Sequence, residues 1–403
     1  MIAYSLDWNN VAVASLSAFF GVNAMYYAIA AIGLNVQFGY AGLLNFGQAG
    51  FMACGAYALG MTSHYFGISL WWGILLGVVY AVGLGLIMGI PTLRLRADYL
   101  AIVTIALAEV VRLTVRSVSF KTYYNGSDGI NGFAEEFRQV TPFNQSGRYE
   151  LSPFADSVST GGAIALWVAF VLTALLFGMM TAQKLKSRKS WPLVPVWLAS
   201  AAAYLGLLLA ISTKLIYPGL QFKSITVGWV IVAILGWLVW LLMRSPWGRV
   251  LKGIREDEEA VRSLGKSVYS YKMQALILGG VIATFAGMML SLDRGSVQPD
   301  NYSRDVTFFV LTALVLGGAA KVSGSIVGPM LFWGVLAFTD VFLNELYKAW
   351  GNNISIFGIE LIASPSQIGQ FQQMLVGAML ILLMVFRPQG LFGNRKEMAL
   401  DGR

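Results

Sequence analysis

Several residue types that build common active sites are almost absent from this sequence. Among its 403 residues there is one cysteine, Cys54, and one histidine, His64. A single cysteine excludes an internal disulfide, and a single histidine argues against a metal site or a catalytic triad built on histidine. No other cluster of catalytic residue types stands out. We therefore expect neither an enzyme nor a bound metal or other cofactor.

Charged residues are also scarce. Only 12% of the residues are charged and 57% are hydrophobic, whereas an average soluble domain is about 25% charged and about 45–50% apolar. Glycine is abundant, with 44 residues, as in transmembrane helices whose backbones approach closely. The composition predicts an all-α, polytopic integral membrane protein that forms a single transmembrane domain over residues 1–403.

A helix needs about 20 apolar residues to cross the hydrocarbon core of a bilayer. By this criterion the sequence predicts about ten or eleven spans, and because residues 1–10 contain no Lys or Arg, the first span and not a cleavable signal is expected to direct insertion. The stretch 306–321 is short and is equally compatible with a partial or re-entrant helix. The predicted spans are 11–36, 41–62, 69–90, 98–117, 160–182, 193–213, 225–243, 271–292, 306–321, 324–343 and 369–387.

Lys and Arg are distributed unevenly between the loops that these spans define. Eighteen lie on one side of the predicted membrane and eight on the other. The positive-inside rule then predicts that the loop 244–272 and the tail 388–403 are cytoplasmic, and that the loop 118–159 and the N-terminus are external. The same rule accounts for the net charge of +8, so we expect lipid and not nucleic acid around the chain.

The predicted cytoplasmic loop 244–272 contains a short amphipathic element. Its acids, from Glu256 to Glu259, suit the first turn of a short helix, and Gly265 suits its C-terminal cap. Apolar residues recur in it at helical spacing: Leu251, Ile254, Val261 and Leu264.

Three roles fit such an element. It can connect two spans along the membrane surface, although four consecutive acids beside anionic lipid disfavour this. It can hold a nucleotide, because Gly265-Lys266-Ser267 resembles the end of a P-loop, but Ala260 stands where that motif needs glycine. It can also dock onto a cytoplasmic partner, with mixed charge setting the register and the apolar stripe supplying affinity. We favour docking.

Ordered blocks of sequence resemble one transport family. Ser245-Pro246-Trp247-Gly248-Arg249, followed by Gly253-Ile254-Arg255-Glu256-Asp257-Glu258 and Ser263-Leu264-Gly265, is similar to the coupling-loop motif of branched-chain amino acid permeases of ABC importers. Further blocks agree with that family along most of the chain, which resembles the larger of the two permeases that such systems pair. These blocks are 33–42 with 55–57, 93–104, 298–300 with 316–318, 324–329 and 387–392.

The resemblance implies a permease in the bacterial cytoplasmic membrane that translocates branched-chain or other hydrophobic amino acids. It implies a second permease subunit as a heterodimer partner, two ATP-binding subunits that hydrolyse ATP, and an external substrate-binding protein. Close relatives import urea or short amides, and this alternative stays open. The ATPase-coupling residues that the motif implies are Gly248, Arg249, Gly253, Arg255, Glu256, Asp257, Glu258 and Gly265.

The sequence also departs from the family pattern. Against that pattern we expect one span fewer before the 33–42 block, and residues 160–213 resemble an added hairpin. A secondary transporter that works without an ATPase is a further alternative, and it predicts ionisable relays or inverted repeats within the membrane. The sequence has one clear acid in the middle of a span, Glu109, and no evident repeat.

Polar residues within the spans are candidates for the translocation path, because ionisable groups are costly there. Glu109 lies on the same helical face as Arg112 and Arg116, so it either forms an internal ion pair or lines and gates the path. Carboxamides between 23 and 48 either hold helices together or mark a broken helix that lines a cavity. The candidate path residues are Glu109, Asn35, Asn45 and Gln48.

Overall fold

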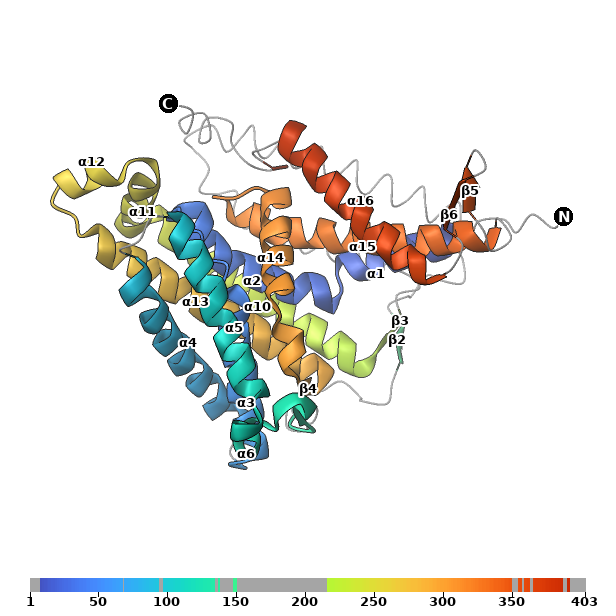
Figure 1. The fold of residues 1–403 in the computed structure, drawn as a ribbon, viewed down its shortest axis with the longest axis horizontal. Helices are drawn as coiled ribbons and strands as arrows, with labels where there is room; N and C mark the ends of the chain where they lie inside the picture. The colour runs from blue at the N-terminus through green and yellow to red at the C-terminus, as the bar shows by residue number, and fades with distance from the viewer. Residues whose placement is uncertain are drawn as a thin grey trace, which may run out of the picture.

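The structure is a computed structural model that describes residues 8–67, 69–93, 97–134, 137, 148–150, 216–349, 354–356, 359–362, 365–386 and 390–391. The predicted hairpin 160–213, most of the predicted loop 118–159 beyond residue 134, and the tail 388–403 apart from 390–391 lie outside the described residues. The described part is a helical bundle (Figure 1).

The helices follow one another along the chain with few strands between them. The long helices are α1 (Trp8–Phe19), α2 (Val22–Leu34), α3 (Gln48–His64), α4 (Leu70–Thr92), α5 (Ala97–Arg116), α10 (Gly219–Arg244), α11 (Pro246–Glu256), α13 (Val268–Arg294), α14 (Arg304–Gly317), α15 (Val322–Ala349) and α16 (Pro365–Phe386). The short helical segments are the π-helix η1 (Asn35–Tyr40), α6 (Lys121–Tyr124), α12 (Glu258–Ser263) and the 3-10 turns η2 (Val118–Phe120), η3 (Gly126–Asp128) and η5 (Pro299–Tyr302).

Three small antiparallel strand pairs accompany the helices. β1 (Ile130–Asn131) pairs with β4 (Ser296–Val297), β2 (Arg148–Glu150) with β3 (Ile216–Pro218), and β5 (Ile354–Ile356) with β6 (Ile359–Ile362). The β1–β4 pair ties the segment after α5 to the end of α13, which brings η5 alongside α5.

Within the described residues, five stretches are long and apolar enough to cross a membrane: Val13–Tyr40, Leu70–Thr92, Ser224–Arg244, Val268–Arg294 and Val322–Ala349. Each coincides with a span predicted from the sequence, and α3, α5 and α16 coincide with three more. The predicted all-α membrane architecture is therefore confirmed.

Two predicted spans are irregular. The first, 11–36, is interrupted at Phe20 and Gly21, where α1 ends and α2 begins. The second, 41–62, is helical only from Gln48 onward, because residues 42–47 form a non-helical connection. Hydropathy misses both breaks because the residues around them are as apolar as those of the helices.

The helix α14 is short, as the sequence suggested for 306–321. Its 14 residues give a length of about 21 Å, less than the ~30 Å of a bilayer core. It ends at Gly317, and a non-helical segment, 318–321, turns the chain into α15. We call residues 318–321 the elbow.

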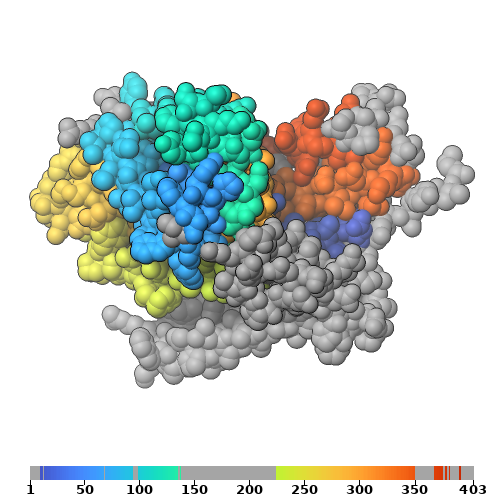
Figure 2. All heavy atoms as spheres, turned by 90° about the horizontal axis from the view of Figure 1, so that it is seen from below, coloured from blue at the N-terminus to red at the C-terminus, as the bar shows by residue number. Residues whose placement is uncertain are grey.

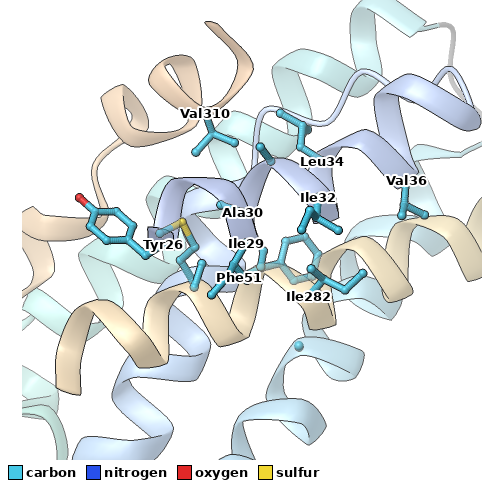
Figure 3. Close-up of a cluster of buried hydrophobic side chains, with 14 of the residues drawn as sticks. Tyr26, Ile29, Ala30, Ile32, Leu34, Val36, Phe51, Ile282 and Val310 are labelled. Atoms are coloured by element: carbon cyan, nitrogen blue, oxygen red, sulfur yellow. The ribbon is translucent and has the colours of Figure 1, made fainter. Parts of the chain in front are cut away.

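The core is built around α2. All residues from Ala24 to Leu34 are buried, as expected for a helix that is apolar on every side. Figure 3 shows its side chains packed with Phe51 of α3, Ile282 of α13 and Val310 of α14. The helix α13 packs along α2, α3 and α4, so these four helices form the rigid centre of the described bundle.

The outer faces of α4 and α10 are strongly apolar. Figure 2 shows α4 in blue and α10 in yellow-green on the surface of the bundle. Both expose large hydrophobic side chains such as Leu75 and Val79 on α4, and Ile234 and Trp237 on α10. Such faces suit contact with lipid chains. The helix α5 also exposes apolar side chains, such as Ile102 and Val110, beside the charged residues described below.

Candidate functional site

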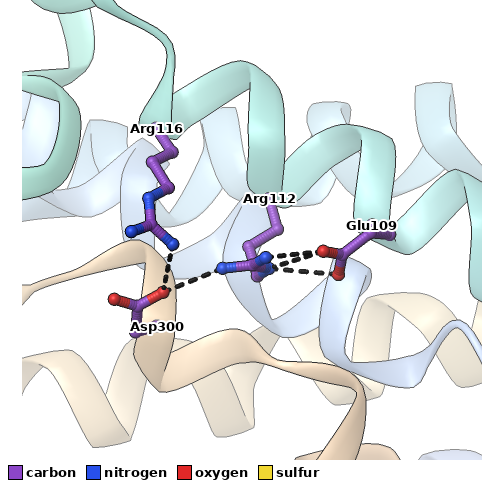
Figure 4. A network of polar contacts seen from close by, with 4 residues as sticks. All are labelled: Glu109, Arg112, Arg116 and Asp300. Carbon is purple, nitrogen blue, oxygen red and sulfur yellow. Dashed lines mark hydrogen bonds and ion pairs between the residues drawn. The ribbon is translucent and has the colours of Figure 1, made fainter.

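Four charged side chains form one network on the surface of α5 (Figure 4). Arg112 donates from Nε to both oxygens of Glu109, at 3.1 and 3.0 Å, and from Nη2 to Glu109 Oε1 at 2.5 Å. Its Nη1 donates to Asp300 Oδ1 at 2.8 Å, and Arg116 Nη1 donates to the same oxygen at 3.1 Å. Glu109, Arg112, Arg116 and Asp300 are called the ion cluster below.

The central residue of the ion cluster is largely buried, whereas its outer residues are exposed to solvent. The Arg112 side chain is only 15% exposed, whereas that of Asp300 is 69% exposed. Arg304, at the start of α14, is exposed and adds a further positive charge near Glu109. Counting back from Arg116, the last residue of α5, Glu109 lies about 10 Å along the helix axis from its end.

The sequence predicted the alternative of an internal ion pair on α5, and the Glu109–Arg112 bond is such a pair. It did not predict that Asp300 joins it, because η5 is 184 residues away from Arg116 in the chain. The signal that could have indicated Asp300 was its place in the family-like block 298–300. The cluster combines both signs of charge on one partly open surface, which suits a solute that carries both an ammonium and a carboxylate.

The candidate carboxamides lie inside the bundle. Asn35, Gln37 and Gln48 are fully buried and Asn45 is 3% exposed. Asn45 Nδ2 donates to Gln37 Oε1 at 2.8 Å, and Asn45 Oδ1 accepts from the Gly47 N–H at 2.8 Å. Both hydrogen bonds stabilise the non-helical connection 42–47.

The remaining carboxamide bonds join different helices. Gln37 Nε2 donates to the Leu276 carbonyl of α13 at 2.8 Å, and Gln48 Nε2 donates to the Ala30 carbonyl of α2 at 3.1 Å. Asn35 bonds both to Ala320 and to Lys321 in the elbow. The contacts between helices fit the packing interpretation, and the non-helical connection 42–47 fits the broken helix of the alternative interpretation. A role of Asn35, Asn45 and Gln48 in the translocation path stays a prediction.

The predicted coupling loop folds into two helices and not one. Asp257 separates α11 from α12 and caps α12, because its Oδ1 accepts from the Ala260 N–H at 2.9 Å. The acids Glu258 and Glu259 occupy the first turn of α12 as predicted, but Glu256 ends α11. Gly265 follows α12 with φ +74°, a conformation that favours glycine.

The apolar stripe of the loop mostly faces the chain itself. Leu251, Ile254 and Val261 are 0%, 4% and 9% exposed, whereas Leu264 is 79% exposed. The expectation that this stripe supplies affinity for a partner therefore needs correction. Three of its four residues pack α11 and α12 onto the bundle, and only Leu264 is left open. Periodicity indicates an apolar face but not what covers it.

The candidate coupling residues have different environments. Gly248 packs tightly against the end of α10, where a Cβ would lie 2.5 Å from the Met243 Cα atom, while Gly253 faces Val261 of α12. Glu258 is held by Arg262 at 2.9 Å and by Lys272 at 2.5 Å. The exposed members of the set are Arg249, Glu256, Asp257 and Gly265.

Arg255 lies on the side of α11 that faces the bundle. Its Nη1 donates to the Gly39 carbonyl oxygen of η1 at 2.6 Å. This contact directs the guanidinium into the transmembrane bundle and away from the exposed end of the loop. Figure 1 shows α11 and α12 projecting together at one end of the bundle.

Comparisons with known proteins agree with this architecture. The family model described as "Branched-chain amino acid transport system / permease component" matches residues 17–384. The chain is 28% identical over 367 residues to LivM of Escherichia coli K12, a high-affinity branched-chain amino acid transport system permease protein, with 91% of this chain and 68% of that protein covered. It is 24% identical over 403 residues to a probable branched-chain amino acid transport permease of Methanocaldococcus jannaschii, with 92% and 91% covered.

A more distant similarity covers part of the chain. The autoinducer 2 import system permease protein LsrC of Escherichia coli O9:H4 is 26% identical over 147 residues, which is 36% of this chain and 42% of that protein. No solved structure matches. All of these relatives are transport permeases and not enzymes. Because the family model extends over nearly the whole sequence, the chain belongs to the family of membrane permease components of branched-chain amino acid transport systems.

Proposed function

We propose that this chain is the permease subunit of an ATP-driven importer of branched-chain or other hydrophobic amino acids. It forms a heterodimer with a second permease. This heterodimer works together with two ATP-binding subunits and an external binding protein. The observation that carries this proposal is the pair of charged helices α11 and α12, which is fixed to the bundle on one face and exposed on the other.

The exposed end of this pair is the proposed docking surface for an ATP-binding subunit. Leu264 offers an apolar side chain, 79% exposed, and Glu256 and Glu259 lie exposed on the same loop. An apolar contact within a rim of charges is a common pattern for specific protein association. The loop lies in the cytoplasm in this proposal, with the N-terminus outside and the C-terminus inside the bacterial cytoplasmic membrane.

The proposed path for the solute runs along the exposed face of α5, between this chain and the second permease. Charged groups at the depth of Glu109 are not stable against lipid chains, so this face suits a partner protein and a hydrated path. The mixed charges of the ion cluster suit an amino acid zwitterion. A role of Asn35, Asn45 and Gln48 in the path is part of this proposal, and all three are buried and hydrogen-bonded inside the bundle.

Reconstitution tests the proposal. The complete complex is purified with its own partners, placed in proteoliposomes and supplied with ATP and the binding protein. We expect uptake of radiolabelled leucine, isoleucine or valine that stops without ATP. Uptake of urea without uptake of these amino acids would assign the chain to a urea or short-amide importer, and uptake by the permease without any ATPase would refute ATP coupling.

The docking surface is tested in the same preparation. Glu259→Lys reverses an exposed charge on α12 and should lower co-purification of the ATP-binding subunit at normal expression. Asp257→Lys is a poorer choice, because it also removes the N-cap of α12, which costs about 1 kcal/mol of helix stability. Unchanged co-purification after both Glu256→Lys and Glu259→Lys would contradict docking at this end of the loop.

A further inference from the structure

The π-helix η1 continues directly from α2, at the end of the bundle where α11 is fixed. π-Helical turns are rare and occur frequently at functional sites. This one contains the buried residues Asn35 and Gln37, and it contacts the coupling loop on one side and the elbow on the other. The π-helix η1 therefore lies between the coupling loop and the elbow.

The contact with the coupling loop is made by α11. Arg255 Nη1 donates to the Gly39 carbonyl at 2.6 Å, and the Lys252 ammonium lies 5.6 Å from the centre of the Tyr40 ring. Gly42, with φ +68°, follows closely, and a Cβ there would lie 3.3 Å from the Arg255 Cγ atom. These three contacts join α11 to η1 and to the residue that begins the connection 42–47.

The contact with the elbow is made by one side chain. Asn35 Oδ1 accepts from the Ala320 N–H at 2.8 Å, and Asn35 Nδ2 donates to the Lys321 carbonyl at 3.0 Å. Ala320 has φ +64°, a conformation that costs free energy for a residue other than glycine and persists only where its surroundings hold it. The bonds from Asn35 pair the Ala320 N–H, which lies outside both helices, and give the Lys321 carbonyl a second donor beside the Ser325 N–H.

Gly39 joins the two contacts. Its carbonyl receives Arg255, and a Cβ on the same residue would overlap the Asn35 side-chain oxygen and lie 2.6 Å from the Ala320 nitrogen. The absence of a side chain therefore lets η1 touch the elbow at the point where it also binds the coupling helix.

The elbow in turn connects to the ion cluster. It follows directly after α14, a helix of 14 residues that ends at Gly317. At its other end, α14 follows the turn η5 that contains Asp300, and Thr307 Oγ1 accepts from the Ala49 N–H of α3 at 2.9 Å. A shift of α14 would move Asp300 relative to Arg112 and Arg116 on α5.

We propose that Arg255, Gly39 and Asn35 are positioning residues that transmit movements of the coupling helix through η1 to the elbow and α14. Arg255 is thus a link into the membrane part and not a contact for the ATP-binding subunit. The inference rests on the proposed function, because it assumes that α11 and α12 respond to that subunit. Energetic coupling along such contacts has to be measured and not assumed from proximity.

The test uses the complete complex in nanodiscs and proteoliposomes with the variants Arg255→Gln and Arg255→Lys. The control is Lys266→Gln, which removes an exposed positive charge from the same loop. We measure co-purification of the ATP-binding subunits, ATP hydrolysis, leucine uptake per ATP hydrolysed, and hydrogen exchange of the peptide that contains residues 318–321.

For Arg255→Gln we expect normal co-purification and basal hydrolysis, faster exchange in the elbow, and uptake per ATP lowered about tenfold, a typical size for coupling between sites. Arg255→Lys can still donate to the Gly39 carbonyl and should restore most of the uptake. Lys266→Gln should match the unmodified complex in all four measurements.

Two results would overturn the inference. Loss of co-purification in Arg255→Gln would make Arg255 a docking residue, and unchanged exchange in the elbow would show that η1 transmits nothing from α11. If the unmodified complex takes up neither leucine nor urea with ATP, the proposed function fails, whereas the exchange measurement still decides whether Arg255 controls the elbow.

Discussion

Glu109→Gln removes one negative charge from the surface of α5 and keeps the size of the side chain. With Arg304 included, the ion cluster has three cations and two anions, so its net charge changes from +1 to +2. An amino acid on the proposed path would place its ammonium near the carboxylates and its own carboxylate near the arginines. The substitution weakens the first contact and slightly favours the second.

The size of the effect follows from Coulomb's law. For an ammonium about 4 Å from the Glu109 carboxylate and a substrate carboxylate about 3 Å farther away, the lost interaction is about 0.4 kcal/mol at a dielectric constant of ~80 and about 1.8 kcal/mol at ~20. This range corresponds to an affinity that is about two- to twentyfold lower at the cluster. A neutral solute such as urea has no such charge pair and should be affected much less.

The assay is the concentration dependence of leucine uptake in proteoliposomes at saturating ATP and binding protein. A suitable control is Glu345→Gln, which removes the same charge from an ion pair with Lys348 at 3.0 Å on α15, away from the ion cluster. If the concentration dependence of leucine uptake in both variants equals that of the unmodified complex, the placement of the path on α5 is refuted. Equal loss in both would indicate a general effect on the fold.

Three further predictions concern the loop and the packing of the bundle. Leu264→Ser should lower co-purification of the ATP-binding subunit without lowering thermal stability, because this side chain is 79% exposed; a lower melting temperature would show that it packs within the chain. Glu259 is exposed, whereas its neighbour Glu258 is ion-paired. A cysteine that replaces Glu259 should therefore react with a membrane-impermeant reagent only from the cytoplasmic side, and labelling from the outside would contradict the proposed topology. Gly33→Ala should destabilise the protein, since a Cβ there would overlap the Gly279 carbonyl oxygen of α13. In the control Gly83→Ala the new Cβ would have no atom within 4 Å, so this variant should be neutral or stabilised by up to about 1 kcal/mol. Equal melting temperatures of the two variants would contradict the close approach of Gly33 to α13.

The sequence predicts local structure well where one side chain decides it. Asp257 has a short polar side chain before two glutamates, and it caps α12. Gly265 ends that helix with a positive φ. Glu109 and Arg112 are three residues apart on a helix and form the expected pair. In each case the partners are within one or two turns, so spacing alone brings them together.

Long-range partners could not be predicted in this way. Asp300 reaches Arg112 only because β1 pairs with β4 and places η5 beside α5. The apolar stripe of the loop was recognised, but its burial depends on how α11 and α12 fold back onto the bundle. An apolar residue on a helix indicates that something covers it, and the sequence does not tell whether the cover is the same chain or a partner.

Two non-helical segments, the connection 42–47 and the elbow 318–321, account for the polar residues near residues 35–48. Non-helical backbone inside a membrane protein must find hydrogen-bond partners within the protein, since lipid offers none. In the connection 42–47, the Phe46 N–H donates to Thr104 Oγ1 at 3.1 Å and the Gly47 N–H to Asn45. In the elbow, Asn35 performs the same task for Ala320 and Lys321.

Both segments therefore depend on side chains from η1 or from its immediate neighbourhood, because Gln37 of η1 also holds Asn45. In both segments side-chain hydrogen bonds, and not i to i−4 backbone bonds, pair part of the backbone. The coupling helix is bonded to η1 through Arg255 and Gly39. Both non-helical segments are thus joined through η1 to the helix α11 of the predicted coupling loop, which is the arrangement that the proposed ATP-driven permease would need.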